Sequence, residues 1–324
     1  MKAMICEAFG GPEVLALRDV PDPPPPGPGE ITVRIAARGV QYVDVLMLAG
    51  KYQFRPEPPF IPGGEAAGQV IAIGADVTGF KLGDEVMSRH TLGACAEIGN
   101  AKAALCDLIP TGMSMEQAGV FRGGYTTAYH ALLQRGRMRA NEWVLVHGAA
   151  GGIGIAAIQL AKLFGAKVIA TASSEAKRAA CLEEGADHAI DYAGGFLDKV
   201  KALTDGRGVD IVYDPIGATV TEESLRTLAW GGRLLVLGFL GGGPANIRSN
   251  YLLIKGIDVI GVRIGGLNEA APATAIANMH ALISLAATGA LRPRISHRFP
   301  LDRAAEALQA VMDRKVIGKA VLVS

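Results

Sequence analysis

The chain has few cysteines and almost no net charge. Its four cysteines, Cys6, Cys95, Cys106 and Cys181, include no C-x-x-C pair, which argues against a disulfide framework or a zinc ribbon and predicts a protein of the reducing cytoplasm. Lysine and arginine together number 32 and aspartate and glutamate 31, so the formal net charge is +1. Because nucleic-acid-binding surfaces need an excess of positive charge, we predict no nucleic-acid partner.

Long apolar runs are also scarce. One long stretch without a charged residue, 143–161, has the length of a membrane span but is interrupted by glycines, His147 and Gln159. We therefore expect a strand, a glycine turn and a helix there, and no membrane association. The first residues lack the apolar segment of a signal peptide, so no targeting signal is expected. Apolar residues nevertheless make up 50% of the 324 residues, which predicts a folded protein of two domains.

The pattern of apolar residues changes near residue 125. Before it, short strands punctuated by Gly and Pro, such as 31–36 and 69–74, predict a β-rich domain over residues 1–124. After it, apolar strands alternate with amphipathic helices, which requires a parallel sheet covered on both faces. We predict an α/β fold with a doubly wound parallel sheet over 125–265 and a tail, 266–324, that returns partly to the first domain. The parallel strands are expected at 143–147, 167–172, 188–191, 210–213, 233–238 and 258–262.

The segment WVLVHGAAGGIG, residues 143–154, carries the clearest site signal. Gly151 and Gly154 follow a predicted strand and open a predicted helix, 152–164. Gly151 has no Cβ to obstruct a pyrophosphate, and Gly154 allows the helix to lie close to the strand, while the helix start supplies free N–H groups. The first glycine of the usual G-x-G-x-x-G pattern is replaced by Ala149. The alternative is a turn that only packs two elements; the strand-turn-helix context favours a dinucleotide site.

The residues that follow the second predicted strand favour NADPH over NADH. An NAD site places Asp or Glu there to accept from the ribose 2′-hydroxyl. Here the positions are Thr171, Ala172, Ser173 and Ser174, so no carboxylate is expected to repel a 2′-phosphate. Lys177 and the neighbouring Arg178 follow as possible cationic donors, although such a pair is often only a solvated helix face.

Seven motifs together resemble the zinc-free NADPH:quinone oxidoreductase family, which includes zeta-crystallin, within the medium-chain dehydrogenase/reductase superfamily. The similarity spans essentially the whole chain, and YTTAYHAL and HGAAGGIG are its most specific parts. It implies a GroES-like β-rich substrate domain, a Rossmann domain inserted between the two parts of that domain, and a homodimer formed by edge pairing of the Rossmann sheets. The motifs are GGEAAGQV (63–70), YTTAYHAL (125–132), HGAAGGIG (147–154), GADHAIDY (185–192), GRGVDIVYDPIG (206–217), GGRLLVLGF (231–239) and GKAVL (318–322).

The resemblance also implies contacts to NADPH. It assigns the pyrophosphate to the glycine turn, the 2′-phosphate to residues after the second and third strands, and the nicotinamide side to two further segments. His130 stands where related reductases have a tyrosine, and Gln41 where they commonly have an asparagine. The implied cofactor residues are Gly151, Gly152 and Ile153 for the pyrophosphate, Ser173, Lys177 and Tyr192 for the 2′-phosphate, and Thr127, His130 and Phe239 on the nicotinamide side.

We predict no metal site. Zinc members of the superfamily take ligands from a GVC segment and a GHE segment, whereas this chain has Gln41 and Gly64 at those places. The closely spaced cysteines of a structural zinc lobe are absent as well. His90 and Cys95 have no third partner nearby in the sequence, so their proximity is more simply explained by chance.

Without a metal, reduction of an activated acceptor is the expected chemistry. A quinone or an α,β-unsaturated carbonyl accepts hydride at an electron-poor carbon, and the developing oxyanion needs only a hydrogen-bond donor. Tyr52 is the candidate donor, because its surroundings resemble a G-x-Y stretch of enoyl thioester reductases. The alternative is that Tyr52 only forms a wall of the apolar cleft expected between the domains. Gln41 is a second candidate for holding acceptor or ribose. The main hypothesis is an NADPH-dependent quinone oxidoreductase; the alternatives are an enone, alkenal or enoyl thioester reductase and a catalytically silent NADPH-binding protein.

Overall fold

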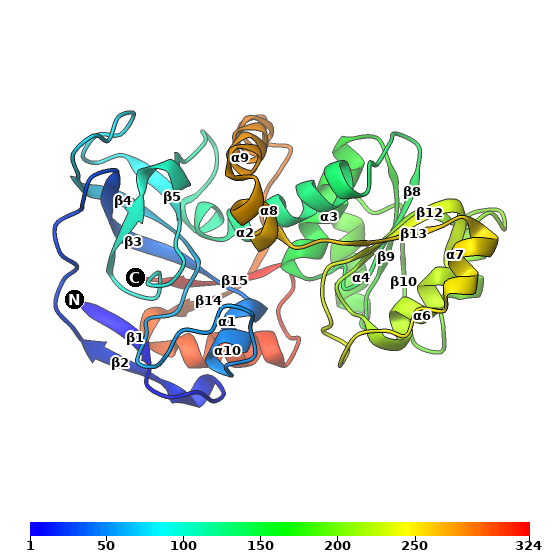
Figure 1. Ribbon diagram of the computed structural model, residues 1–324, viewed down its shortest axis with the longest axis horizontal. Helices are drawn as coiled ribbons and strands as arrows, with labels where there is room; N and C mark the ends of the chain where they lie inside the picture. The colour runs from blue at the N-terminus through cyan, green and yellow to red at the C-terminus, as the bar shows by residue number, and fades with distance from the viewer. The chain divides into compact units, whose positions relative to one another are not determined.

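The computed structural model describes residues 1–324, which divide into two compact units (Figure 1). Unit 1 comprises Met1–Gly123 and Ala286–Ser324, and unit 2 comprises Gly124–Leu285. Residues 266–285, predicted as part of the tail, belong to unit 2 instead. A reciprocal amide pair links this segment to Gln134 of unit 2: Gln134 Nε2 donates to Asn278 Oδ1 at 2.8 Å, and Asn278 Nδ2 donates to Gln134 Oε1 at 3.1 Å.

Unit 1 is built on a seven-stranded sheet in the order β14-β15-β3-β4-β5-β7, with β6 pairing β3. A separate hairpin-like pair, β1 and β2, is antiparallel. The strands are β1 (Lys2–Cys6), β2 (Leu15–Asp19), β3 (Glu30–Val40), β4 (Glu65–Ile73), β5 (Glu85–Arg89), β6 (Ile98–Lys102), β7 (Cys106–Leu108), β14 (Ile295–Pro300) and β15 (Lys319–Val323). The helices are α1 (Tyr42–Leu48) and α10 (Ala304–Met312), with short 3₁₀ turns η1 (Pro12–Val14), η2 (Ala103–Leu105) and η4 (Leu301–Arg303).

The C-terminal segment 286–324 belongs to unit 1. Strand β15 lies between β14 and β3, parallel to the first and antiparallel to the second, with Val321 opposite Gly39. In Figure 1 the red strand β15 therefore runs beside the blue strand β3. Buried Leu322 joins an apolar core that includes Val45 of α1 and Leu308 of α10, so both ends of the chain contribute to one core.

Unit 2 contains a six-stranded, all-parallel sheet in the order β10-β9-β8-β11-β12-β13. This is the Rossmann order 3-2-1-4-5-6, in which the strand order reverses between β8 and β11 and leaves a crevice at their carboxyl ends. The strands are β8 (Trp143–Val146), β9 (Lys167–Thr171), β10 (His188–Ile190), β11 (Val209–Asp214), β12 (Leu228–Val236) and β13 (Asp258–Gly261). The helices are α3 (Gly152–Leu163), α4 (Glu175–Glu183), α5 (Leu197–Leu203), α6 (Ala218–Thr227), α7 (Ser249–Lys255), α8 (Ile264–Ala270) and α9 (Pro272–Ala287). Helix α2 (Met115–Tyr129) begins in unit 1 and continues in unit 2 as the π-helix η3 (His130–Arg135).

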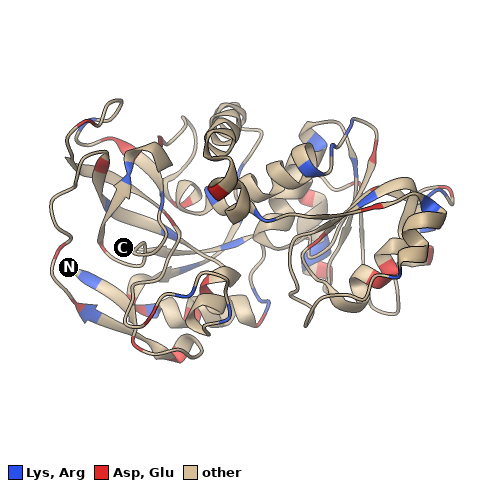
Figure 2. Cartoon of the chain, viewed as in Figure 1, with Lys and Arg blue, Asp and Glu red and all other residues tan.

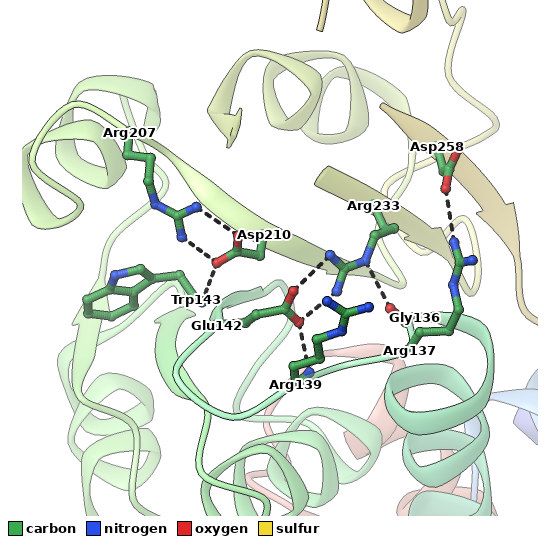
Figure 3. Close-up of polar contacts among 9 residues, drawn as sticks. All are labelled: Gly136, Arg137, Arg139, Glu142, Trp143, Arg207, Asp210, Arg233 and Asp258. Atoms are coloured by element: carbon green, nitrogen blue, oxygen red, sulfur yellow. Dashed lines mark hydrogen bonds and ion pairs between the residues drawn. The ribbon is translucent and has the colours of Figure 1, made fainter. Parts of the chain in front are cut away.

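Charged side chains join the amino-terminal ends of the Rossmann strands (Figure 3). Asp210 of β11 accepts hydrogen bonds from the backbone N–H of Trp143 at 2.8 Å and from Arg207 at 2.9 Å. Glu142, just before β8, accepts two hydrogen bonds from Arg233 of β12, at 3.0 and 2.7 Å. The Asp210–Trp143 hydrogen bond and the bidentate Glu142–Arg233 pair therefore connect three neighbouring strands, β8, β11 and β12.

The surface of each unit carries both signs of charge. Figure 2 shows Lys and Arg interspersed with Asp and Glu along the elements of both units. No helix combines the length and the apolar character needed to cross a membrane.

Candidate functional site

The glycine turn between β8 and α3 has the geometry of a phosphate-binding loop. Gly148 adopts φ +57°, a left-handed conformation that favours glycine, and its carbonyl accepts a hydrogen bond from the N–H of Gly151 at 3.0 Å. The tight turn is therefore made at Gly148. Ala149 at the first motif position does not disrupt it, because the neighbouring glycine supplies the unusual backbone conformation.

Gly154 is required by the packing of α3 against this turn. A Cβ at Gly154 would lie 2.5 Å from the carbonyl oxygen of Ala149 and 2.6 Å from that of Gly148. A Cβ at Gly151 would meet only the Gly148 carbonyl, at 3.3 Å. Protein atoms thus exclude a side chain at Gly154, whereas at Gly151 there is nearly enough room for one.

The start of α3 supplies hydrogen-bond donors. Gly151 is the N-cap, and Gly152 and Ile153 are the first two helical residues, whose N–H groups have no acceptor within the helix. The positive end of the helix dipole adds to their attraction for an anion. The three residues predicted to contact a pyrophosphate therefore form one donor cluster at the carboxyl end of β8.

His147 precedes the glycine turn and has a structural role, because both nitrogens of its ring are hydrogen-bonded within the protein. Its Nδ1 lies 2.9 Å from Thr171 Oγ1 and its Nε2 lies 2.8 Å from Ser224 Oγ. Because the Ser224 hydroxyl donates to the Val220 carbonyl at 2.7 Å, it accepts from Nε2–H, and Nδ1 accepts from Thr171. Burial lowers the pKa of His147 to about 4, although Asp214 and Glu223 oppose that shift, so the ring is neutral at pH 7.

Three predicted 2′-phosphate residues gather where β9 and β10 end. Ser173 is exposed just beyond β9, Lys177 lies in the first turn of α4, and Tyr192 follows β10. The N–H of Ala172 donates to the Ile190 carbonyl at 3.1 Å, which holds the two strand ends together. Ser174, not Ser173, caps α4 by accepting from the Lys177 N–H at 3.3 Å.

The structure also brings a carboxylate to this place, which the sequence window 171–174 did not reveal. Asp191 follows β10, and its Oδ2 lies 3.4 Å from Arg178. Arg178 also donates to the Ala172 carbonyl at 3.2 Å. The expectation that no carboxylate lies near the predicted 2′-phosphate site is therefore wrong. Parallel pairing places the end of β10, and with it Asp191, beside the end of β9. Arg178 offsets the charge of Asp191.

The loops after β11 and β12 lie beside each other at the carboxyl ends of these strands. Phe239 follows β12 and is 51% exposed, and a Cβ at Gly217 would lie 3.1 Å from its ring, so the two loops touch. Buried Asp214 shapes the first loop, although its sequence motif gave no sign of this role. Its carboxyl group accepts hydrogen bonds from the N–H groups of Ile216 at 2.7 Å and Gly217 at 3.1 Å, and from the Thr221 hydroxyl.

Thr127 and His130 lie one turn apart on α2 and η3. They therefore share a helix face, with Thr127 half-buried and His130 buried. His130 Nδ1 is 2.6 Å from Gln134 Oε1, and Gln134 is paired in turn with Asn278. The π-helical turn brings His130 and Gln134 into this contact; π-helical turns often occur at functional sites.

Gln41 and Tyr52 lie in unit 1, on either side of α1. Gln41 is the N-cap of α1, and its N–H donates to Asp44 Oδ2 at 2.8 Å. Tyr52 is half-buried in the loop after α1. The fold thus separates the predicted residues into a cofactor group in unit 2 and these two in unit 1.

Three buried charged residues surround the start of α1, and no sequence motif assigned them a role. Asp44, Glu65 and Lys319 are 6%, 3% and 8% exposed. Burial raises the pKa of Asp44 to about 7; Glu65 adds to this shift, while Lys319 and the Gln41 N–H oppose it. Residues so far apart in sequence gave no local signal, because only strand pairing brings β15 to β4 and α1.

The two positions where zinc members of the superfamily carry ligands hold Gln41 and Gly64. No group of three or more His, Cys, Asp or Glu side chains in the 324 residues is placed to hold one. Position 64 has room for a side chain, since the nearest atom to a Cβ there is the His90 carbonyl oxygen at 3.7 Å, yet the residue is glycine. His90 instead contacts Ser88 Oγ at 2.8 Å, and burial lowers its pKa to about 4.

A Rossmann unit inserted into a β-rich unit defines a medium-chain dehydrogenase/reductase, and the family comparisons agree. The alcohol dehydrogenase GroES-like domain family matches residues 27–137, and the zinc-binding dehydrogenase family matches residues 152–281. The mouse (Mus musculus) quinone oxidoreductase-like protein 2 is 36% identical over 323 residues, covering 99% of this chain and 91% of the relative. The chain belongs to the quinone oxidoreductase family of this superfamily and is an oxidoreductase.

Two solved structures have the same fold over the whole chain. A probable oxidoreductase from Mycobacterium abscessus is 38% identical with a TM-score of 0.92, covering 100% of this chain and 99% of that one. The Escherichia coli quinone oxidoreductase, solved in complex with NADPH, is 29% identical with a TM-score of 0.91, and the match covers 100% of both chains.

Proposed function

We propose that the protein is an NADPH-dependent quinone oxidoreductase that works without a catalytic metal. The observation that carries the proposal is the donor cluster at Gly151, Gly152 and Ile153, set at the carboxyl end of β8 where the strand order reverses. Relatives named as quinone oxidoreductases, one of them solved with NADPH, support the choice of cofactor and acceptor.

In this proposal unit 2 holds the cofactor. The N–H groups of Gly152 and Ile153 bind the pyrophosphate, and Ser173, Lys177 and Tyr192 bind the 2′-phosphate. Arg178 neutralises Asp191, which would otherwise repel that phosphate. NADPH, when bound, supplies a hydride to an electron-poor carbon of the acceptor.

Thr127, His130 and Phe239 orient the nicotinamide side. Phe239 offers an exposed aromatic surface at the end of β12, and the Gln134 contact holds the ring of His130 in one orientation. Fixed groups of this kind contribute to rate by restricting the geometry of reaction.

Residues of unit 1 are proposed to handle the acceptor. A quinone oxygen that gains negative charge needs a hydrogen-bond donor. The Tyr52 hydroxyl and the Gln41 amide are the donors we assign to it. Besides the hydride, the reduction takes up one proton, which can come from water, so the chain need not supply an acid.

Metal independence is part of the proposal, although one of the matching families is described as zinc-binding. An amide at Gln41 and a glycine at Gly64 provide no zinc ligand. Elemental analysis of the purified protein tests this directly. Stoichiometric zinc whose removal by EDTA abolishes activity would refute it.

The function is tested by an NADPH oxidation screen across ortho-quinones, para-quinones, alkenals and acyl thioesters, with NADH in parallel. We expect quinone-dependent oxidation that is faster with NADPH than with NADH. NADPH binding without turnover of any acceptor would instead indicate the catalytically silent alternative.

One observation favours an enone or enoyl thioester reductase as the second candidate. Tyr52 is half-buried, and no hydrogen bond within the protein engages its hydroxyl, so it is available as a proton donor. Reduction of an enone requires a proton on carbon, whereas reduction of a quinone protonates only oxygen. Faster turnover of alkenals than of any quinone would favour this alternative.

We further propose a homodimer, in a reducing compartment such as the cytoplasm. Strand β13 is an edge of the Rossmann sheet, and unpaired edges invite pairing with a second copy. Nearby Trp230, Leu253 and Ile254 are 83%, 86% and 70% exposed, and Trp230 lies against the end of α7 near Gly256. Sedimentation analysis of wild type and of Leu253→Asp tests the dimer, and a monomeric wild type would refute it.

All four cysteines are free and buried, as expected in a reducing compartment.

A further inference from the structure

A buried ion pair in unit 1 has no role in the function proposed above. Lys319 Nζ, from β15, lies 3.0 Å from Glu65 Oε1, at the start of β4, and the side chains are 10% and 3% exposed. Taking two charges out of water is costly, and such a pair often adds no net stability compared with apolar residues. Stability alone therefore does not explain its presence.

The second oxygen of Glu65 makes a specific contact. Glu65 Oε2 accepts a hydrogen bond from the N–H of Gly123 at 2.7 Å, and Gly123 lies within helix α2. The carboxylate reaches this position by crossing β3 at Gly39, where a Cβ would lie 2.4 Å from Glu65 Oε1. Glycine at position 39 thus leaves the space that the Glu65 side chain occupies.

The peptide held by Glu65 forms the surface against which Gln41 packs. A Cβ at Gly123 would lie 2.8 Å from Gln41 Nε2 and 2.9 Å from its Oε1, so the amide of Gln41 rests directly on Gly123. The backbone of Gln41 is held separately, by its hydrogen bond to Asp44. The backbone of Gln41 is therefore held by Asp44, and its side-chain amide lies against the peptide that donates to Glu65.

We propose that Glu65, with Lys319 as its buried counter-ion, is a positioning residue that fixes the Gln41 side chain for the acceptor by holding the Gly123 peptide. This inference rests on the proposed role of Gln41 in acceptor binding. A hydrogen bond from an N–H group to a carboxylate is stronger than one between neutral groups, and the Glu65 carboxyl group lies 3.0 Å from the Lys319 ammonium.

The charges around the cluster are consistent with this assignment. The titratable groups that face Asp44 are Glu65, Lys319 and Cys95, and burial together with Asp44 raises the pKa of the Cys95 thiol to about 12, so Cys95 carries no charge. Lys319 is thus the cation that faces both carboxyl groups. The Lys319 ammonium is paired with the Glu65 carboxyl group. No second cation is paired with Asp44, whose pKa is raised to about 7 by burial.

Two charge-free double variants test the proposal without leaving a buried charge unpaired. Glu65→Gln/Lys319→Met keeps an oxygen that can accept from Gly123, and Glu65→Leu/Lys319→Met removes it at similar side-chain volume. We expect the leucine variant to lose about tenfold or more in kcat/KM for the acceptor, since small displacements of positioned groups have effects of this size. The glutamine variant should stay within about threefold of wild type, and both should bind NADPH as wild type does.

The same pair is then made in a Gln41→Ala background. If Glu65 acts through Gln41, the difference between the leucine and glutamine variants disappears there, because the residue being positioned is gone. A purely structural effect would persist. Arg233→Met is the matched control in unit 2, where the Arg233–Glu142 pair is 12% and 17% exposed; it should lower the unfolding temperature without changing the effect of Gln41→Ala.

Hydrogen exchange of the peptide 119–126 gives a readout that needs no acceptor. Exchange there should be faster in the leucine variant than in the glutamine variant, and equal to wild type in the control. If wild type reduces no acceptor, the proposed function fails while the exchange comparison still decides whether Glu65 holds Gly123. Equal exchange in the two double variants, equal kcat/KM, or a difference that persists in Gln41→Ala would overturn the proposal.

Discussion

Alanine at position 154 should separate α3 from the glycine turn. The added Cβ would lie 2.5–2.6 Å from three backbone atoms of Gly148 and Ala149, none of which can move independently of the turn. Overpacking of this kind costs about 3 kcal/mol, and the better helix propensity of alanine returns about 1 kcal/mol. The net loss of about 2 kcal/mol corresponds to a fall of roughly 4–8 °C in Tm for a domain of this size.

Gly151→Ala is the matched variant. Its φ of −82° suits alanine, and the nearest atom to the new Cβ is 3.3 Å away, so we expect a wild-type Tm. The methyl group would occupy the space that a pyrophosphate approaches, and NADPH affinity should fall roughly tenfold or more.

Thermal unfolding and fluorescence titration with NADPH measure the two effects separately. We expect Gly154→Ala to lose both stability and affinity, and Gly151→Ala to lose affinity alone. A Gly154→Ala protein with wild-type Tm and wild-type NADPH affinity would refute the close packing of α3 on the turn. Wild-type affinity in Gly151→Ala would refute the assignment of the turn to the pyrophosphate.

Four further substitutions test individual residues. Lys177→Ala should weaken NADPH binding by about 1.5–3 kcal/mol, the value of a hydrogen bond to a charged group, with NADH binding unchanged by calorimetry; an equal effect on both nucleotides would contradict the 2′-phosphate role. Arg178→Ala leaves Asp191 without its cation, so the ratio of NADPH to NADH affinity should fall, and an unchanged ratio would argue against this role for Arg178. Tyr52→Phe should sharply reduce enone reduction while sparing quinone reduction if the hydroxyl protonates carbon; equal losses would show that it does not. Because burial raises the pKa of Asp44 to about 7, its contribution to stability is full below its ordinary pKa and is lost as pH rises through about 7. Asp44→Asn should therefore be more stable than wild type at pH 8 and lose that advantage at pH 5, as measured by denaturant unfolding; the same difference at both pH values would contradict the raised pKa.

Local patterns were sufficient to predict the Rossmann unit. The predicted helix 152–164 corresponds to α3, Gly152–Leu163, and the six predicted parallel strands correspond to β8–β13, with the largest boundary error at the start of β12. Strand-helix alternation has a strong periodic signal, and the glycine turn marks the start of α3.

Contacts between distant segments could not be predicted in this way. Glu65 and Lys319 are 254 residues apart, and neither lies in a pattern that signals a partner. Asp191 was missed because the search for a carboxylate followed one strand, whereas a parallel neighbour places its own end at the same edge. The motif showed that Ala149 replaces the first glycine, but it did not show that Gly148 makes the tight turn instead. The left-handed φ of Gly148 could not be predicted, because it depends on how the turn closes.

The position of β15 between β14 and β3 has a consequence for biosynthesis. Residues 319–323 are made only after all of Gly124–Leu285 has left the ribosome, so the sheet of unit 1 lacks an interior strand while unit 2 is already complete. Domains tend to fold as units during translation, and here the inserted one is ready first. Released chains that end just before β14 should thus contain a protease-resistant nucleotide-binding half joined to an amino-terminal half that chaperones still recognise.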